Sequence, residues 1–133
     1  MADFRVLPPE RLTAWLSSHA PTMPAVRLEP RLWLVSGDCG VPPADGIAED
    51  VSDAYVAFAV EGEGAADLLA QGLALDLGLF AIDAGCRTRL GDIPVILTRT
   101  SAGFVLRCER SYAEWLGAWL ARAQSLTASA GGI

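Results

Sequence analysis

The segment GCRTRLGDIPVILTRTSAGFVLRCE, residues 85–109, decides the fold class of this chain. Two short turns, Gly91-Asp92 and Ser101-Ala102-Gly103, divide it into three runs, and this pattern predicts three consecutive strands. The expected strands are Gly85–Leu90, Ile93–Thr100 and Gly103–Glu109. Apolar and polar side chains alternate along the last of them. The second and third strands are therefore expected to form a hairpin with one buried face.

A further strand is expected ahead of these three, over Ala54–Glu61. Its two faces are both apolar, with Val56, Phe58 and Val60 on one and Tyr55, Ala57 and Ala59 on the other. A strand without a polar face is normally covered on both sides. The residues after it, Ala65–Gln71, predict a short helix that Gly72 closes.

A longer helix is expected after the three strands. Ser111 and Glu114 have the spacing of a capping box, and the helix is predicted to run to about Gln124. Its apolar stripe comprises Trp115, Leu116, Trp119, Leu120 and Ala123. Residues 50–124 thus form the main domain, an α+β unit in the order β-α-β-β-β-α with its helices on one face of a mostly antiparallel sheet. Residues 125–133 are expected to be a flexible tail.

Residues 1–49 are expected to contain a short helix, a small strand pair and a linker. Pro9 and Glu10 suit the start of a helix, which is predicted over Pro8–Ser18. The strand pair is expected at Ala25–Leu28 and Arg31–Val35. The linker is rich in glycine, proline and acidic residues, and it leads into the main domain.

The composition limits the possible partners. Hydrophobic residues make up 52% of the chain, an excess that requires a large core, a membrane or a surface covered by another protein. The longest apolar stretches are far shorter than the ~20 residues of a spanning helix, and the N-terminus has no secretion signal, so a cytoplasmic protein is expected. The net charge of −6 disfavours binding to nucleic acid.

The residues that usually carry catalysis are sparse. The single histidine, His19, is expected in a solvated loop, and the three cysteines, Cys39, Cys86 and Cys108, lack the spacing of a zinc site. The glycine-rich turn Glu61–Ala66 has two carboxylates where a pyrophosphate would bind, which disfavours a dinucleotide site. The sequence therefore predicts no catalytic, cofactor-binding or metal-binding residue in this chain.

Aromatic side chains on the last helix allow two interpretations. Trp115 and Trp119 are four residues apart and share a helix face, and Tyr112 lies at its start. This face either belongs to the core or is partly exposed to a partner, since Trp and Tyr are favoured anchors at protein interfaces.

Five short blocks, in this order and spacing, are similar to the gamma subunit family of heterotetrameric sarcosine oxidase. They are Asp50-Val51-Ser52-Asp53-Ala54, Leu68-Leu69-Ala70-Gln71-Gly72, Leu75-Asp76-Leu77, Cys86-Arg87-Thr88-Arg89-Leu90-Gly91 and the segment 110–120, RSYAEWLGAWL. The resemblance covers residues from about Asp50 to Ala123, and Leu32-Trp33-Leu34 adds a weaker match upstream.

The resemblance implies a fold akin to the folate-binding aminomethyltransferase (glycine-cleavage T-protein) superfamily. It also implies a place in a complex of alpha, beta, gamma and delta chains that oxidatively demethylates sarcosine to glycine. In that family FAD, FMN and NAD belong to the alpha and beta chains, folate to the alpha chain and zinc to the delta chain. The gamma chain resembles an assembly partner of the alpha and beta subunits, with no cofactor of its own.

The expected partner interface combines three arginines of the predicted strands with the aromatic residues of the last helix: Arg87, Arg89, Arg107, Tyr112, Trp115 and Trp119. The arginines either contact partner carboxylates or are merely solvated. Other functions stay open, namely a stand-alone domain that binds folate or another small ligand and a small enzyme in its own right. A complex acting on a different N-methyl amine and a homo-oligomer of the isolated chain are further possibilities.

Overall fold

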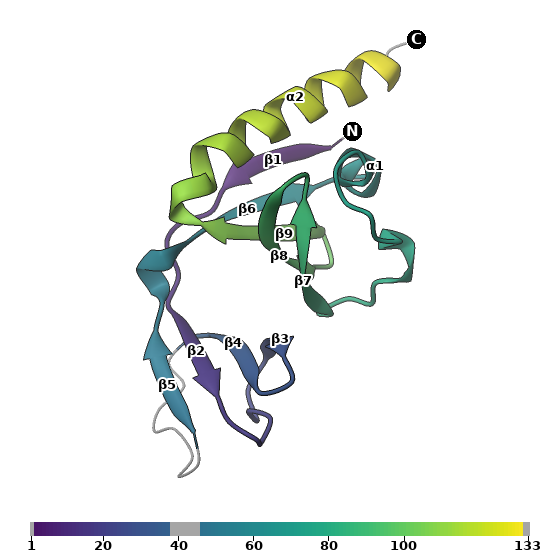
Figure 1. The fold of residues 1–133 in the computed structure, drawn as a ribbon. Helices are drawn as coiled ribbons and strands as arrows, with labels where there is room; N and C mark the ends of the chain where they lie inside the picture. Colours follow the sequence, from purple (N-terminus) through teal and green to yellow (C-terminus); the bar gives the residue numbers. More distant parts are fainter. Residues whose placement is uncertain (1, 38–45, 132–133) are drawn as a thin grey trace.

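The computed structural model describes residues 2–37 and 46–131, and within them the strands form two antiparallel sheets (Figure 1). The larger sheet has five strands in the order β1-β6-β9-β8-β7. Their bounds are Asp3–Val6 for β1, Tyr55–Glu61 for β6, Gly103–Glu109 for β9, Ile93–Arg99 for β8 and Gly85–Leu90 for β7. The predicted strands of residues 54–61 and 85–109 are thus confirmed to within one residue. Gly91, at φ +60°, makes the turn between β7 and β8.

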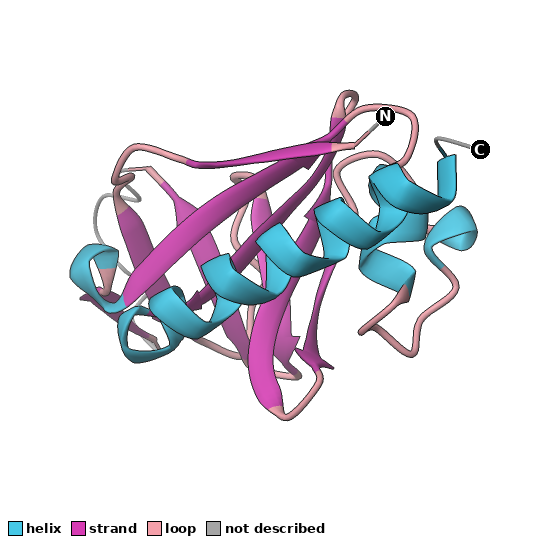
Figure 2. Cartoon of the chain, turned by 90° about the horizontal axis from the view of Figure 1, so that it is seen from above, coloured by secondary structure: helices cyan, strands magenta, loops and turns pink. Residues whose placement is uncertain are grey.

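Two helices cover one face of the larger sheet, as the sequence predicts. α1 (Ala65–Ala70) and the long α2 (Ala113–Gly131) pack against β6, β8 and β9, and Figure 2 shows α2 crossing the sheet obliquely. Leu116 and Leu120 of α2 are fully buried there, together with Leu68 and Leu69 of α1. This apolar layer is the main core of the molecule.

A second, smaller sheet faces the opposite side of the larger one. Its strand order is β3-β4-β2-β5, with bounds Ala25–Glu29 for β3, Leu32–Ser36 for β4, Leu12–Leu16 for β2 and Ile47–Asp50 for β5. Leu12 and Leu34 of this sheet pack on Ile96 of β8. The smaller sheet lies below the larger one in Figure 1. β6, which lies next to β9 in the larger sheet, is buried on both of its faces as its sequence indicated, with Phe58 and Ala57 each below 9% exposed.

The prediction of a helix over Pro8–Ser18 is wrong, because the central part of that segment is strand β2. The apolar residues Leu12, Trp15 and Leu16 do have helical spacing, yet pairing with β4 and β5 imposes an extended backbone. In this strand Leu12 points toward the larger sheet, whereas Trp15 packs beside its cross-strand partner Trp33 on the other side. Tertiary pairing here outweighs local periodicity.

Both ends of the last helix differ from the prediction. The chain enters it through a short 3-10 turn, η3 (Arg110–Tyr112), and the predicted cap residue Ser111 lies inside this turn. At the other end the helix continues to Gly131, beyond the predicted end near Gln124.

The first strand departs from the expected division of the chain. Residues 3–6 pair with β6 and so belong to the larger sheet, not to the N-terminal unit. The strand pair at β3 and β4 is confirmed. Residues 38–45 of the predicted linker, including Cys39, lie outside the described residues. The linker prediction is wrong for Ile47–Asp50, which pairs with β2 as strand β5.

Candidate partner-binding surface

Trp115 is the large aromatic side chain that α2 leaves in contact with solvent. Its residue is 45% exposed. The indole lies over the β7–β8 turn, where a Cβ atom at Gly91 would be 3.4 Å from Trp115 Cη2. Because the turn has no side chain at this point, the ring rests on the backbone with one face open. Of the two interpretations of this helix face, exposure therefore applies to Trp115.

Trp119 has a different environment, although it is one helical turn away. Its ring packs on the main core and covers Gly72, where a Cβ atom would be only 2.5 Å from Trp119 Cζ2. The amide of Gly91 donates to the carbonyl of Gly72 at 3.2 Å, so the segments beneath the two tryptophans are joined. Tyr112 also packs against this core. For Trp119 and Tyr112 the core interpretation is therefore the better one.

Arg87 and Arg89 lie on β7, an edge strand of the larger sheet, and both are exposed. Arg87 forms an ion pair with Glu29 of β3 at 3.1 Å, which links the edges of the two sheets. Arg89 is two residues from the turn that supports Trp115. The partners of Arg87 and Arg89 on β8 are Ile96 and Pro94, and Ile96 packs on the smaller sheet, so both arginines lie on the face of β7 that is turned away from α2. Trp115 lies on the helix side of the same edge. We call these three residues, which flank β7 from opposite faces, the β7-edge surface.

Arg107 does not belong to that surface, and the expectation that it points outward is wrong. Its side chain is only 10% exposed, in the space between the two sheets, and its Nη2 is 2.7 Å from Oε1 of Glu10. The alternation along β9 correctly placed Arg107 opposite the helices. The smaller sheet, which sequence reasoning did not predict in full, covers that face.

A hollow of about 380 Å³ adjoins Arg107 between the sheets. Thr98, Ser36 and the acidic residue Asp83 are the other polar residues of its wall, which also contains apolar residues such as Leu34 and Val26. Because Glu10 already neutralises the guanidinium of Arg107, this arginine offers little net charge to an anionic ligand. The hollow therefore gives no particular support to a folate-type site.

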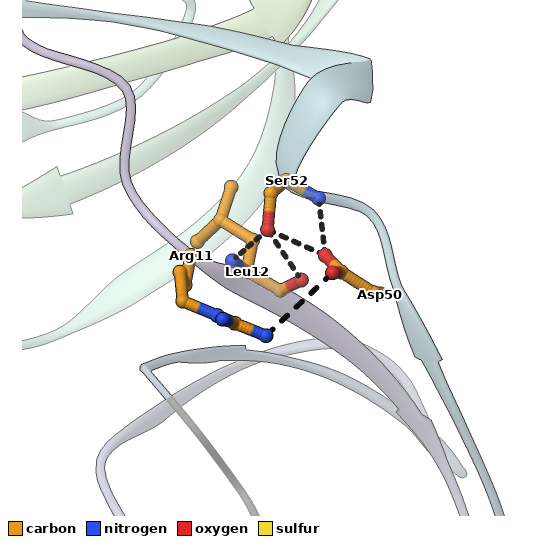
Figure 3. Close-up of polar contacts among 4 residues, drawn as sticks. All are labelled: Arg11, Leu12, Asp50 and Ser52. Atoms are coloured by element: carbon orange, nitrogen blue, oxygen red, sulfur yellow. Dashed lines mark hydrogen bonds and ion pairs between the residues drawn. The ribbon is translucent and has the colours of Figure 1, made fainter.

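Ser52 lies where the chain passes from β5 of the smaller sheet into β6 of the larger one, and its hydrogen bonds tie this connection to β2 and β5 (Figure 3). Its Oγ accepts a hydrogen bond from the amide of Leu12 at 2.9 Å and contacts the carboxylate of Asp50. The hydroxyl and the amide of Ser52, in that order of effect, hold the pKa of Asp50 below its ordinary value. Arg11 lies 3.8 Å from the same carboxylate. From the sequence, Arg11 and Leu12 were expected in a helix, and no pattern indicated that Asp50 and Ser52 would contact them.

The residues considered for catalysis are dispersed. Burial raises the pKa of the Cys108 thiol to about 11 and that of Cys86 in the same direction, so neither favours a reactive thiolate. His19 is exposed and contacts Ser18 at 3.3 Å. Among residues 2–37 and 46–131 no three His, Cys, Asp or Glu side chains gather as metal ligands. No helix in the same ranges is long and apolar enough to cross a membrane.

Comparison with known proteins is informative at the level of structure. No protein-family model and no curated protein matches the sequence. Among solved structures, a chain of heterotetrameric sarcosine oxidase from Corynebacterium sp. U-96, determined in complex with pyrrole 2-carboxylate, superposes with a TM-score of 0.79. The match covers 93% of this chain and 84% of the other, at 19% sequence identity.

The chain has the fold of a sarcosine oxidase chain. The resemblance to sarcosine oxidase seen in the sequence blocks is thereby confirmed at the level of fold. The common fold spans most of both chains.

Proposed function

We propose that this chain is a non-catalytic, gamma-type subunit of a heterotetrameric sarcosine oxidase-like complex. The observation that carries the proposal is the common fold along 93% of the chain. The sequence blocks between Asp50 and Leu120 support the same assignment independently of the coordinates. In this proposal the complex is cytoplasmic and demethylates sarcosine oxidatively to glycine.

The cofactors of the proposed complex are carried by its other subunits. FAD, FMN and NAD belong to the alpha and beta chains in this scheme, folate to the alpha chain and zinc to the delta chain. The raised pKa of both described cysteines and the paired state of Arg107 support a chain that contributes contacts and no reactive group.

The β7-edge surface is the first contact with the alpha or beta subunit in this proposal. Trp115 supplies a large apolar area on the helix side of this edge, and Arg89 supplies, on the other side, a guanidinium that can bind a planar carboxylate with two hydrogen bonds. Such a combination of an aromatic anchor and an arginine is common at the energetic centre of interfaces.

The test is co-expression of the chain with its flavin-bearing subunits, followed by size exclusion recorded at a flavin wavelength. We expect the 14.0 kDa chain to elute with the flavin absorbance. Elution of the chain only at its own size would refute the proposal. Calorimetry of the isolated chain with tetrahydrofolate is expected to give no saturable heat, whereas a saturable signal would favour a ligand-binding domain.

A further inference from the structure

The loop between α1 and β7 exposes aliphatic side chains to an unusual degree. Leu79, at the end of the 3-10 turn η2 (Leu77–Leu79), is 83% exposed, and Ile82 is 59% exposed. Asp76 and Asp83 flank this segment on either side, and no basic residue occurs between them. We call Leu79 and Ile82 the loop tip.

The loop tip is held firmly from beneath. Nη1 of Arg99 donates to the carbonyl oxygens of Leu77, at 3.3 Å, and of Phe80, and its guanidinium lies 5.6 Å from the centre of the Phe104 ring. Leu77 is buried and Phe80 packs against the core. The loop therefore presents Leu79 and Ile82 outward from a fixed base. A preordered segment loses less conformational entropy when it binds.

Most backbone amides of the loop already have acceptors within the chain. Amides that donate in this way are those of Gly78, Leu79, Phe80, Asp83 and Ala84. A buried amide without an acceptor costs free energy. Because these groups are satisfied in advance, a second molecule can cover the tip without leaving them unpaired.

We propose that the loop tip inserts into an apolar pocket with a basic rim on a partner subunit of the complex. This inference rests on the proposed function. The two side chains expose on the order of 250 Å², well below the roughly 800 Å² per partner that a stable interface buries, so the tip alone does not sustain a homodimer. It fits a concave pocket as one element of a larger interface, and the flanking carboxylates match basic side chains at the rim.

The test compares two double variants within the co-expressed complex. Leu79→Ser with Ile82→Ser removes the apolar tip, and Val6→Ser with Ile47→Ser makes the same change at two residues that are 60% and 65% exposed elsewhere. All four side chains are at the surface, so both variants should fold, which circular dichroism of the isolated chains will show. We expect the tip variant to bind the flavin-bearing subunits at least tenfold more weakly, and the control to bind like the wild type.

The charge of the rim is tested by Asp83→Asn. Asn tolerates the positive φ of 70° at this position, so the change removes charge with little strain. We expect a few-fold loss of affinity and a weaker dependence of the affinity on salt. An unchanged salt dependence would refute the basic rim.

The outcomes separate this inference from the proposed function. If the wild-type chain does not join the flavin-bearing subunits, both fail. If the wild type joins them and the tip variant binds equally well, the inference fails alone. If the isolated wild type is a dimer that the tip substitutions dissociate, the tip binds a second copy of this chain and the inference is likewise refuted.

Discussion

Arg107 and Glu10 form an ion pair between the two sheets although 97 residues separate them in the sequence, and both Nε and Nη2 of the arginine lie 2.7 Å from the same carboxylate oxygen. The two partners differ in their access to water. The side chain of Arg107 is 10% exposed and that of Glu10 is 34% exposed. Removal of Glu10 and removal of Arg107 should therefore reduce the stability of the fold by different amounts.

Glu10→Ala is expected to reduce the free energy of unfolding by about 3 kcal/mol, because it leaves the guanidinium buried without a counter-charge. Arg107→Met should cost only about 1 kcal/mol, since the carboxylate of Glu10 can turn to water. Urea unfolding measures both. Equal costs near zero would mean that the pair contributes nothing to the packing of the sheets.

The two tryptophans of α2 should behave in opposite ways. Trp119→Ala is expected to lower the free energy of unfolding by about 3 kcal/mol, because the ring fills the core above Gly72. Trp115→Ala should cost less than about 1 kcal/mol and instead weaken binding to the flavin-bearing subunits. Unfolding curves and co-elution distinguish the effects. A Trp115→Ala chain that joins the complex normally would remove Trp115 from the interface.

Two glycine-to-alanine changes provide a matched test of the packing. A Cβ atom at Gly103 would lie 2.2 Å from the carbonyl oxygen of Val60, a backbone atom that β-pairing holds in place, so Gly103→Ala should be severely destabilising. At Gly117 the nearest atom would be Phe58 Cε1, at 3.6 Å, and alanine should stabilise α2 by about 0.5–1 kcal/mol. Thermal melting measures both shifts, and the same sign for both would contradict the prediction.

Ser52→Ala is expected to raise the pKa of Asp50, because the hydroxyl of Ser52 is the main cause of its lowered value. A carboxyl whose pKa is lower in the folded state contributes stability above its ordinary pKa of 3.8, and this contribution is lost as the pH falls below that value. Carbon NMR titration of the Asp50 carboxyl measures the change. Ser52→Thr, which keeps the hydroxyl, is the control, and an unmoved Asp50 in the alanine variant would contradict the assignment.

Cys108 should make the protein less stable in alkali. Its thiol has a pKa of about 11 in the folded state because of burial, against 9.0 ordinarily. The folded state thus keeps a proton that the unfolded state releases, and stability present below pH 9.0 is lost as the pH rises toward 11. The free energy of unfolding of the wild type should fall between these pH values, and the fall should be smaller in Cys108→Ala, where Cys86 is the remaining described thiol with a raised pKa. If the free energies of unfolding of the wild type and of Cys108→Ala changed in parallel with pH, the prediction would be contradicted.

The sequence was sufficient for elements whose signals are local. The turn at Gly91 and the alternation along Gly103–Glu109 specify the hairpins directly. β2 was missed because its pairing with β4 and β5, and not its own spacing, makes it a strand. β1 was missed because four residues with no regular alternation carry no clear pattern before β6 is placed beside them.

The candidate surface was predictable only in part. Trp115 and Trp119 belong to one helical stripe, and the positions of Gly91 and Gly72 decide which ring is open to water. No sequence pattern indicates that Arg107 pairs with Glu10. The position of the loop tip depends on hydrogen bonds from Arg99 to two carbonyl oxygens around twenty residues earlier in the chain. No local sequence pattern predicts these bonds.

The attachment of β1 to the larger sheet has a consequence for folding kinetics. Arg5 bonds to Glu61, 56 residues later, and Gln124 of α2 holds the carbonyl of Ala2 across a separation of 122 residues. Chains rich in such non-local contacts fold slowly, in milliseconds to seconds, because loop-closure entropy is lost before the contacts form. On the ribosome, β1 emerges well before either of its partners is made. The pairing of β1 with β6 therefore has to wait for the residues between them, and the contact of β1 with α2 forms only once that helix has also been made.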